Sequence, residues 1–298
     1  MWAVKQRGVA LIMVLWMIVV MLSLAVTLMF SVKTETNIVS YARETAQARA
    51  IAEAAAHYAV MQLSLLPEKR ELKIGGDQAL LWEYEGYKTE IRVIGENGLI
   101  NINNTPRPLI QKALKLAKLS DQDSEILLDQ IEDFRDADVL KHVNGAEDED
   151  YERAGREYGA KDAAFENIEE LQQVLGMTPE VYNSLVSYFS VHSNGQGINP
   201  MLAPRHVLLL LAEGDSAAVD AYLKQRAEAK GDWVKPDFGG DLVESSEQLT
   251  YRLQLTVKAE HRDIVYREER AIRLLPGRNP PFMTYYRHPL AESATRFE

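Results

Sequence analysis

The sequence predicts an α+β fold: a long N-terminal helix, then an antiparallel sheet that a large all-α insertion domain splits into two parts. Three observations support this prediction. An apolar run at residues 9–32 continues into an amphipathic stretch without a helix stop. Strand-like segments lie near both ends of the water-facing part of the chain, and the region between them has helical periodicity.

The apolar run predicts one membrane-spanning helix. At 1.5 Å per residue, residues 9–32 form a helix of about 36 Å, and a hydrocarbon core is about 30 Å thick. A cleaved signal peptide would have a shorter apolar region of about 7–15 residues and a small-residue exit site. Because Lys5 and Arg7 precede the run, the N-terminus is expected in the cytoplasm and the bulk of the chain across the membrane.

The helix is expected to continue beyond the membrane to about residue 66. Apolar residues such as Ala50, Ala54 and Tyr58 recur near helical spacing, and Pro67 supplies a stop. This outer half is rich in alanine and amphipathic. We therefore expect it to pack against a sheet or against other helices.

Strand patterns occur in two separate regions. Residues 80–84 and 87–94 form the first pair, while 249–257 and 264–274 form the second, with a turn at His261, Arg262 and Asp263. Because a two-stranded hairpin alone is marginally stable in water, the late strands are expected to pair with the early ones. The chain beyond residue 280 shows no regular pattern.

The intervening residues 106–244 are predicted to be all helical and strongly acidic, with 27 Asp and Glu against 14 Lys and Arg. Helix starts are expected at Pro106, at Pro204, and at Thr178 followed by Pro179. Ile-Asn pairs precede Pro106 and Pro204 by the same distance, which indicates an internal repeat. Residues 174–179 also resemble the turn of a helix-hairpin-helix module.

Composition argues against several classes of function. The chain has no cysteine, so disulfides and thiol chemistry are excluded. No zinc-protease pair, nucleophile elbow or phosphate-binding glycine loop occurs, and we expect no enzymatic activity. Acidic neighbours around residues 174–179 disfavour nucleic acid binding, because phosphate neutralisation needs clustered Lys and Arg.

Several motifs in order resemble the general secretion pathway protein K family, the large minor pseudopilins of bacterial type II secretion systems. They start with Gly8, which stands between a basic leader and the apolar run. The others are residues 100–106 (ININ-NTP), 133–138 (DFRDAD), 144–147 (NGAE), 169–171 (EEL), 176–179 (GMTP) and 198–200 (INP).

The resemblance implies a domain organisation and a processing event. Prepilin peptidase would cut between Gly8 and Val9, leaving the helix on the mature, N-methylated chain. The expected parts are a leader (1–8), a transmembrane helix (9–32), a pilin-like α+β domain (33–105 and 245–280), an inserted acidic helical domain (106–244) and a C-terminal tail (281–298).

The resemblance also implies a role in assembly. The family is placed at the tip of the periplasmic pseudopilus with minor pseudopilins I and J, above the major pseudopilin, where it initiates and limits assembly for export of folded proteins across the outer membrane. It is anchored in the inner membrane. Other pseudopilins carry a glutamate five residues into the mature chain, but here that position is Met13. A subunit with no neighbour above it needs no such charge.

The acidic loop at residues 133–152 is the candidate metal site. Calcium takes six to eight oxygen ligands, but no EF-hand register occurs, so the residues alone favour a solvated loop. The resemblance implies calcium binding in the helical domain. The expected ligands are Asp133, Asp136, Asp138, Glu147 and Asp150.

Two other functions stay open from the sequence. One is a single-pass membrane-anchored binding module that uses its helix-hairpin-helix elements on DNA, as in DNA uptake. The other is a membrane-anchored hydrolase, for which no catalytic constellation is identified. Loss of residues 1–8 from the mature chain would separate a pseudopilin from both.

Overall fold

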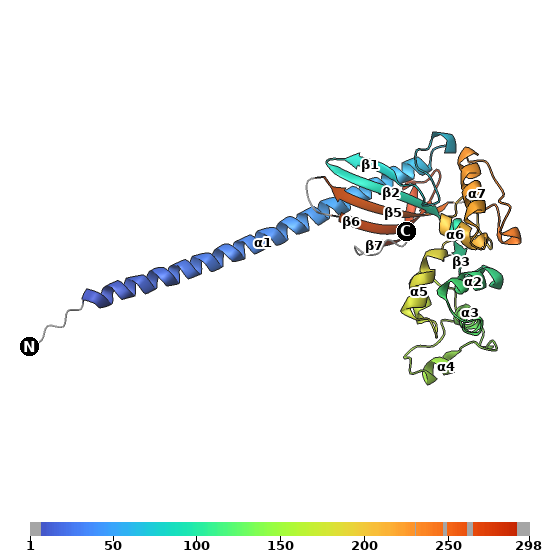
Figure 1. The fold of residues 1–298 in the computed structure, drawn as a ribbon, viewed down its shortest axis with the longest axis horizontal. Coiled ribbons are helices and arrows are strands. Elements are labelled where there is room, and N and C mark those ends of the chain that lie inside the picture. The colour runs from blue at the N-terminus through green and yellow to red at the C-terminus, as the bar shows by residue number, and fades with distance from the viewer. Residues whose placement is uncertain (1–6, 230, 247–248, 261–264, 291–298) are drawn as a thin grey trace, which may run out of the picture.

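A single helix, α1 (Arg7–Leu63), dominates the shape of the molecule. The computed structural model describes residues 7–229, 231–246, 249–260 and 265–290. The first half of α1 projects far from the folded head, and its second half lies against the sheet (Figure 1). A short 3-10 turn, η1 (Pro67–Lys69), follows the helix. The prediction of one long helix that ends before Pro67 is confirmed.

Small side chains let α1 approach the sheet closely. Ala52, Ala55, Ala56 and Ala59 are fully buried. They pack in one apolar core with inward-facing residues of the sheet, such as Leu253. Alanine costs no side-chain entropy in a helix and leaves little distance between backbone layers. The alanine-rich pattern therefore becomes the packing face expected from the sequence.

Five antiparallel strands form the main sheet, in the order β1-β2-β5-β6-β7. Strand β2 pairs with β5, with Tyr87 opposite Ala259 and Gly95 opposite Tyr251. Strands from before and after the helical region thus build one sheet, as predicted. The predicted turn at residues 261–263 lies outside the described residues. The strands are β1 (Leu80–Tyr84), β2 (Tyr87–Gly95), β5 (Thr250–Ala259), β6 (Val265–Leu274) and β7 (Phe282–Pro289).

Strand β7 corrects the prediction of an irregular tail from residue 281. It pairs antiparallel with β6, from Phe282 opposite Leu274 to Pro289 opposite Glu268. The strand shows no apolar alternation because polar groups lie on both sides. Arg287 donates to Glu268 and Glu53, while Tyr286 donates to Glu269. Backbone pairing and these polar contacts hold the strand in place, and Phe282 adds an apolar contact to the core of the sheet.

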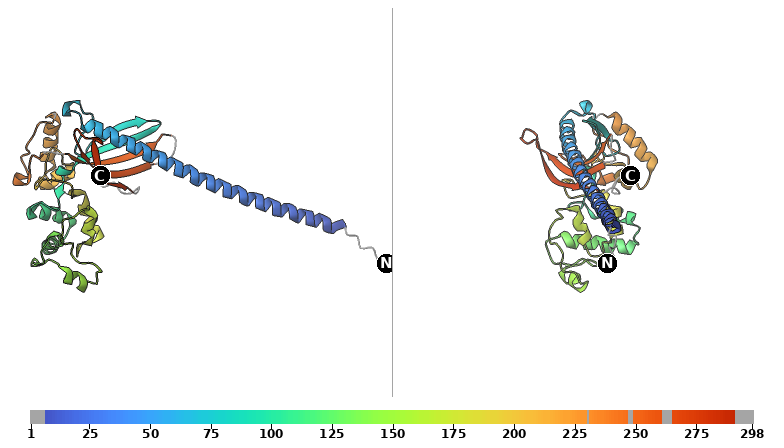
Figure 2. Two further views of the ribbon diagram at one scale, coloured as in Figure 1. Left: turned by 180° about the vertical axis from the view of Figure 1, so that it is seen from behind. Right: turned by 90° about the vertical axis from the view of Figure 1, so that its left-hand side faces the viewer.

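The helical domain has its own core and lies at one end of the sheet, away from the projecting part of α1 (Figures 1 and 2). Ile94, Leu99 and Ile100 belong to this core, so it includes residues before the predicted border at 106. Its α-helices are α2 (Arg107–Leu114), α3 (Asp121–Arg135), α4 (Asp148–Arg153), α5 (Pro179–Leu185), α6 (Arg205–Leu211) and α7 (Ser216–Glu228).

The prediction of an all-α domain is wrong in one place. Strand β3 (Ile100–Asn101) pairs parallel with β4 (Phe189–Ser190) inside the helical domain. These strands have two residues each, too few for an alternating pattern to be visible. Short 3-10 segments join the longer elements at η2 (Glu96–Gly98), η3 (Lys115–Ala117), η4 (Ile168–Gln173), η5 (Val186–Tyr188) and η6 (Gly240–Leu242).

The three predicted helix starts are confirmed. Thr178 caps α5, its hydroxyl accepting from the backbone N–H of Val181 at 3.3 Å, and Pro179 is the first helical residue. Pro106 and Pro204 are the N-cap residues of α2 and α6. Each of these helices therefore begins one residue after its proline rather than at it. Gly176 adopts φ +83°, which lets the chain turn from η4 into α5.

Candidate membrane anchor and metal centre

The N-terminal half of α1 is apolar on every side. Val9, Leu11 and Met13 are 59%, 74% and 67% exposed. Within the described residues this is the one helix long and apolar enough to cross a membrane. Gly8 and Val9, the predicted processing residues, lie in the first turn of α1. Such a surface requires lipid or partner helices around it.

The second candidate site lies where α3 ends. Ser120 caps the start of α3, its hydroxyl accepting from the backbone N–H of Asp123. At the other end, Phe134 stacks on Phe165 with ring centroids 5.3 Å apart and also meets Tyr151. These apolar contacts fix the last turn of α3. Asp133 within that turn and Asp136 at its C-cap are thereby held in place.

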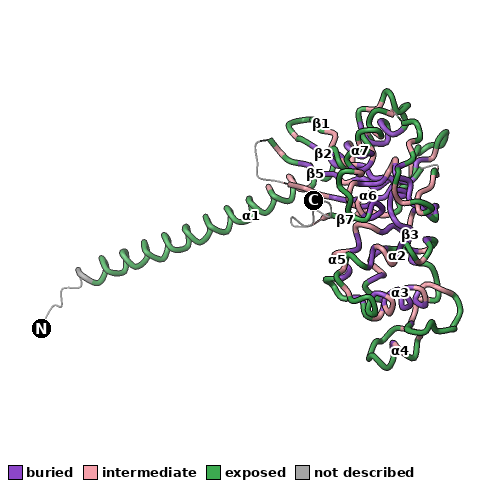
Figure 3. Tube along the Cα trace, turned by 45° about the vertical axis from the view of Figure 1, so that its right-hand side comes forward, coloured by how far each residue is buried: buried purple, intermediate pink, exposed green. Residues whose placement is uncertain are grey.

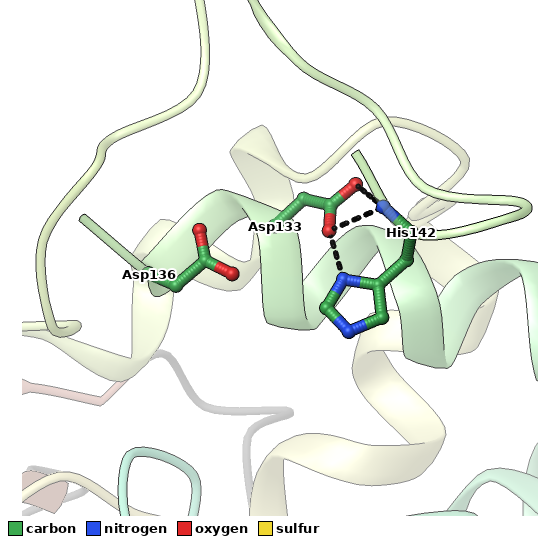
Figure 4. A group of neighbouring side chains, drawn as sticks. All are labelled: Asp133, Asp136 and His142. Atoms are coloured by element: carbon green, nitrogen blue, oxygen red, sulfur yellow. Dashed lines mark hydrogen bonds and ion pairs between the residues drawn. The ribbon is translucent and has the colours of Figure 1, made fainter. Parts of the chain in front are cut away.

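Asp133 is the most deeply placed carboxylate of the group. It is fully buried, and both of its oxygens accept from the backbone N–H of His142 at 3.2 Å. The His142 ring also bonds to it through Nδ1 (Figure 4). Gly145 lies so close that an added Cβ would overlap the Asp133 carboxylate. The loop after α3 therefore wraps tightly around this one side chain.

Asp136 and Glu147 each have a buried carboxylate oxygen, Oδ1 and Oε1, with no hydrogen-bond partner. Burial raises the pKa of Asp136, and the carboxylates of Asp138 and Asp133 raise it further. Burial likewise raises the pKa of Glu147 to about 7, with repulsion from Asp133 and Asp136 as the next causes. Unpartnered buried carboxylate oxygens are costly unless a cation neutralises them.

The structure brings some of the predicted ligands together and leaves others apart. Asp133, Asp136 and His142 offer ligand atoms within 4.8 Å of one another. Asp138 is exposed, and its Oδ1 accepts from the backbone N–H of Leu140. Asp150 pairs with Lys141 at 2.8 Å and Arg153 at 2.9 Å, and hydrogen bonds from Lys141 and from the Glu147 backbone lower its pKa. Asp150 is therefore already satisfied by protein groups.

Residues 93–194, which include this cluster, match the family model of type II secretion system protein K. No curated protein matches the chain at comparable significance.

A solved structure shares the fold. The chain is similar to one chain of the crystal structure of the GspK-GspI-GspJ complex from the type 2 secretion system of enterotoxigenic Escherichia coli. The two share 15% sequence identity with a TM-score of 0.61, and the match covers 84% of this chain and 98% of that one.

Sequence reasoning missed one residue of the candidate metal centre, His142. It follows Asp133 by nine positions in a loop without periodicity, so no spacing rule could connect the two. Asp148 lies in the predicted acidic loop but was not among the expected ligands, and Asp162 lies outside that loop. Both add negative charge near Glu147. The density of carboxylates between residues 133 and 162 was the available signal.

Proposed function

We propose that this chain is a minor pseudopilin of a type II secretion system, a membrane-anchored assembly protein rather than an enzyme. The observation that carries the proposal is the match of residues 93–194 to the protein K family model, on the same chain as a long helix whose first half is apolar on all sides. The apolar half of α1 anchors the chain in the inner membrane. The head then lies in the periplasm, consistent with Lys5 and Arg7 on the cytoplasmic side.

The head is suited to a position at the tip of a filament, with minor pseudopilins of the I and J types as neighbours. A solved complex of GspK with GspI and GspJ has a chain of the same fold, which supports these partners. The helical domain widens the head beyond the α1-sheet unit (Figure 2). Met13 is uncharged, so this position holds no carboxylate that a subunit above it would have to neutralise.

We also propose that the cluster at the end of α3 binds calcium. Asp133, Asp136 and His142 offer ligand atoms within 4.8 Å of one another, and Glu147 adds a buried carboxylate oxygen without a hydrogen-bond partner. Carboxylate oxygens suit a hard cation such as calcium. A bound ion would satisfy the orphan oxygens and fix the loop after α3. Asp138 and Asp150 contribute charge nearby, while Asp150 stays with its basic partners.

The mass of the mature N-terminus tests the proposal. We expect the chain purified from membranes to start at Val9, and a Gly8→Val variant to stay full-length, because a bulky residue blocks the peptidase site. Co-purification with co-expressed minor pseudopilins is the second readout. A wild-type chain that retains residues 1–8 and captures no pseudopilin would refute the assignment and favour the membrane-anchored DNA-binding alternative.

A further inference from the structure

The loop between α3 and α4 exposes three large apolar side chains. Val139, Leu140 and Val143 are 78%, 76% and 94% exposed. We refer to these three residues as the apolar loop. They lie in the part of the helical domain farthest from the sheet, beside α3 and α4 (Figures 1 and 3). Three large apolar side chains within five residues, each more than three-quarters exposed, form the kind of surface that marks an interaction site.

Polar contacts hold the apolar loop in its outward orientation. The backbone N–H of His142 donates to Asp133, and that of Leu140 donates to Asp138 at 2.8 Å. Lys141, between the apolar residues, bonds to Asp150. The Lys141 side chain and the His142 backbone are thus turned toward Asp150 and Asp133, while the apolar side chains are exposed. This division of roles presents a preformed contact surface.

We propose that the apolar loop is a docking surface for a folded protein whose binding face is an apolar pocket bordered by Lys or Arg. Charge complementarity selects this partner. Residues 133–153 carry eight Asp and Glu but three Lys and Arg, so an apolar pocket with a basic border is attracted and oriented. A second copy of this chain would bring an equally acidic surface and be repelled.

A lipid surface fits the observations less well. The acidic residues around the loop repel anionic lipids. The inference rests on the proposed function in one respect: calcium at Asp133 would fix the backbone of His142, and hence the loop.

Site-specific photocrosslinking with the full-length chain in secreting cells tests the proposal. The photoreactive amino acid p-benzoylphenylalanine replaces Ala137, which is exposed and next to the loop. The same probe at Leu81 on β1, 69% exposed, is the matched control. We expect a protein adduct at position 137 whose crosslinked peptide lies in an apolar pocket flanked by Lys or Arg. The Leu81 probe should not give that adduct.

The apolar residues are then removed in the probe-bearing chain by Val139→Ser, Leu140→Ser and Val143→Ser together. We expect the adduct yield to fall at least tenfold, while processing at Gly8 and co-purification with minor pseudopilins persist. Processing and co-purification report on the proposed function, whereas the adduct yield reports on the apolar loop, so the two claims can fail separately. An unchanged yield, adducts to lipid, adducts to a second copy, or a crosslinked peptide without basic flanks would each overturn it.

Discussion

Arg252 on β5 and Glu96 in η2 form a two-point ion pair that joins the sheet to the helical domain. Arg252 Nε and Nη2 lie 3.1 and 3.2 Å from the two Glu96 oxygens, and Nη2 also donates to the Phe189 carbonyl on β4 at 3.2 Å. The side chains are 2% and 0% exposed. Although burial opposes the charge, Glu96 raises the pKa of Arg252 well above its ordinary value.

Removal of one partner of this ion pair should therefore destabilise the folded state strongly. Arg252→Met leaves the Glu96 carboxylate buried and uncompensated, and we expect a loss of about 3–5 kcal/mol in the free energy of unfolding. Denaturant titration of the detergent-solubilised chain, followed by fluorescence, measures it. The double variant Arg252→Met with Glu96→Leu should recover part of the loss.

A surface pair between β5 and its neighbour β2 provides the control. Lys258 and Glu90 are 2.9 Å apart, with side chains 50% and 28% exposed. Because water screens this pair, Lys258→Met should cost about 0–1 kcal/mol. Equal losses for Arg252→Met and Lys258→Met would mean that burial does not govern the first pair.

The alanine face of α1 gives a second prediction. Ala55 is fully buried against the sheet, whereas Ala46 on the same helix is exposed. Ala55→Leu forces extra methylenes into a packed interface and should destabilise the head by about 1–3 kcal/mol. Ala46→Leu should change the monomer's unfolding free energy by less than about 0.5 kcal/mol. Similar losses in the two variants would argue against close packing at Ala55.

If the calcium site exists, neutralising its carboxylates should have opposite effects on stability in calcium and in chelator. At a hundredfold excess over its dissociation constant, calcium should stabilise the head by about 2.7 kcal/mol relative to chelator, because it binds the native state. Asp136→Asn with Glu147→Gln should abolish this gain. In chelator the double variant should melt higher than the wild type, since the mutual repulsion is relieved.

Asp150→Asn is the matched control because Asp150 already pairs with Lys141 and Arg153. Melting curves by differential scanning fluorimetry, with calcium and with chelator, compare the three chains. The Asp150 variant should keep its calcium response. A wild-type curve that is the same in both conditions would leave the loop as a solvated acidic segment.

A buried histidine makes stability depend on pH. His206 bonds through Nε2 to the Ser187 carbonyl and meets Tyr188 edge to face. Burial lowers the pKa of His206. As pH falls below about 6.5, the unfolded chain takes up this proton before the folded one, so stability falls with pH. Replacement by His206→Phe removes that contribution.

The slope of unfolding free energy against pH between 7.5 and 5.5 measures the effect. The His206→Phe variant should show a shallower slope than the wild type, whatever its absolute stability. The contribution of His192, whose pKa burial also lowers, stays in both chains and cancels in the comparison. Parallel slopes would show that His206 is not buried in its neutral form.

The sequence alone determined the elements with strong local signals. Residues 7–63 form one helix because apolar and alanine periodicity runs on until Pro67, and β2 and β5 follow clear strand patterns. Thr178 with Pro179 fixes a helix start through local hydrogen bonding. The predicted family resemblance agrees with the family-model match of residues 93–194, where several of the motifs occur in order.

Tertiary structure alone decided the features that depend on distant partners. Strand β7 exists because β6 offers free backbone groups, and β3 with β4 joins segments almost ninety positions apart. His142 contacts Asp133 because the loop after α3 folds back toward the helix. Gly145, which has no side chain, allows this loop to approach the Asp133 carboxylate. Asp150, similar to its neighbours in sequence, is turned toward Lys141 and Arg153. Local pattern encodes period and capping, whereas these contacts arise only when separate elements pack together.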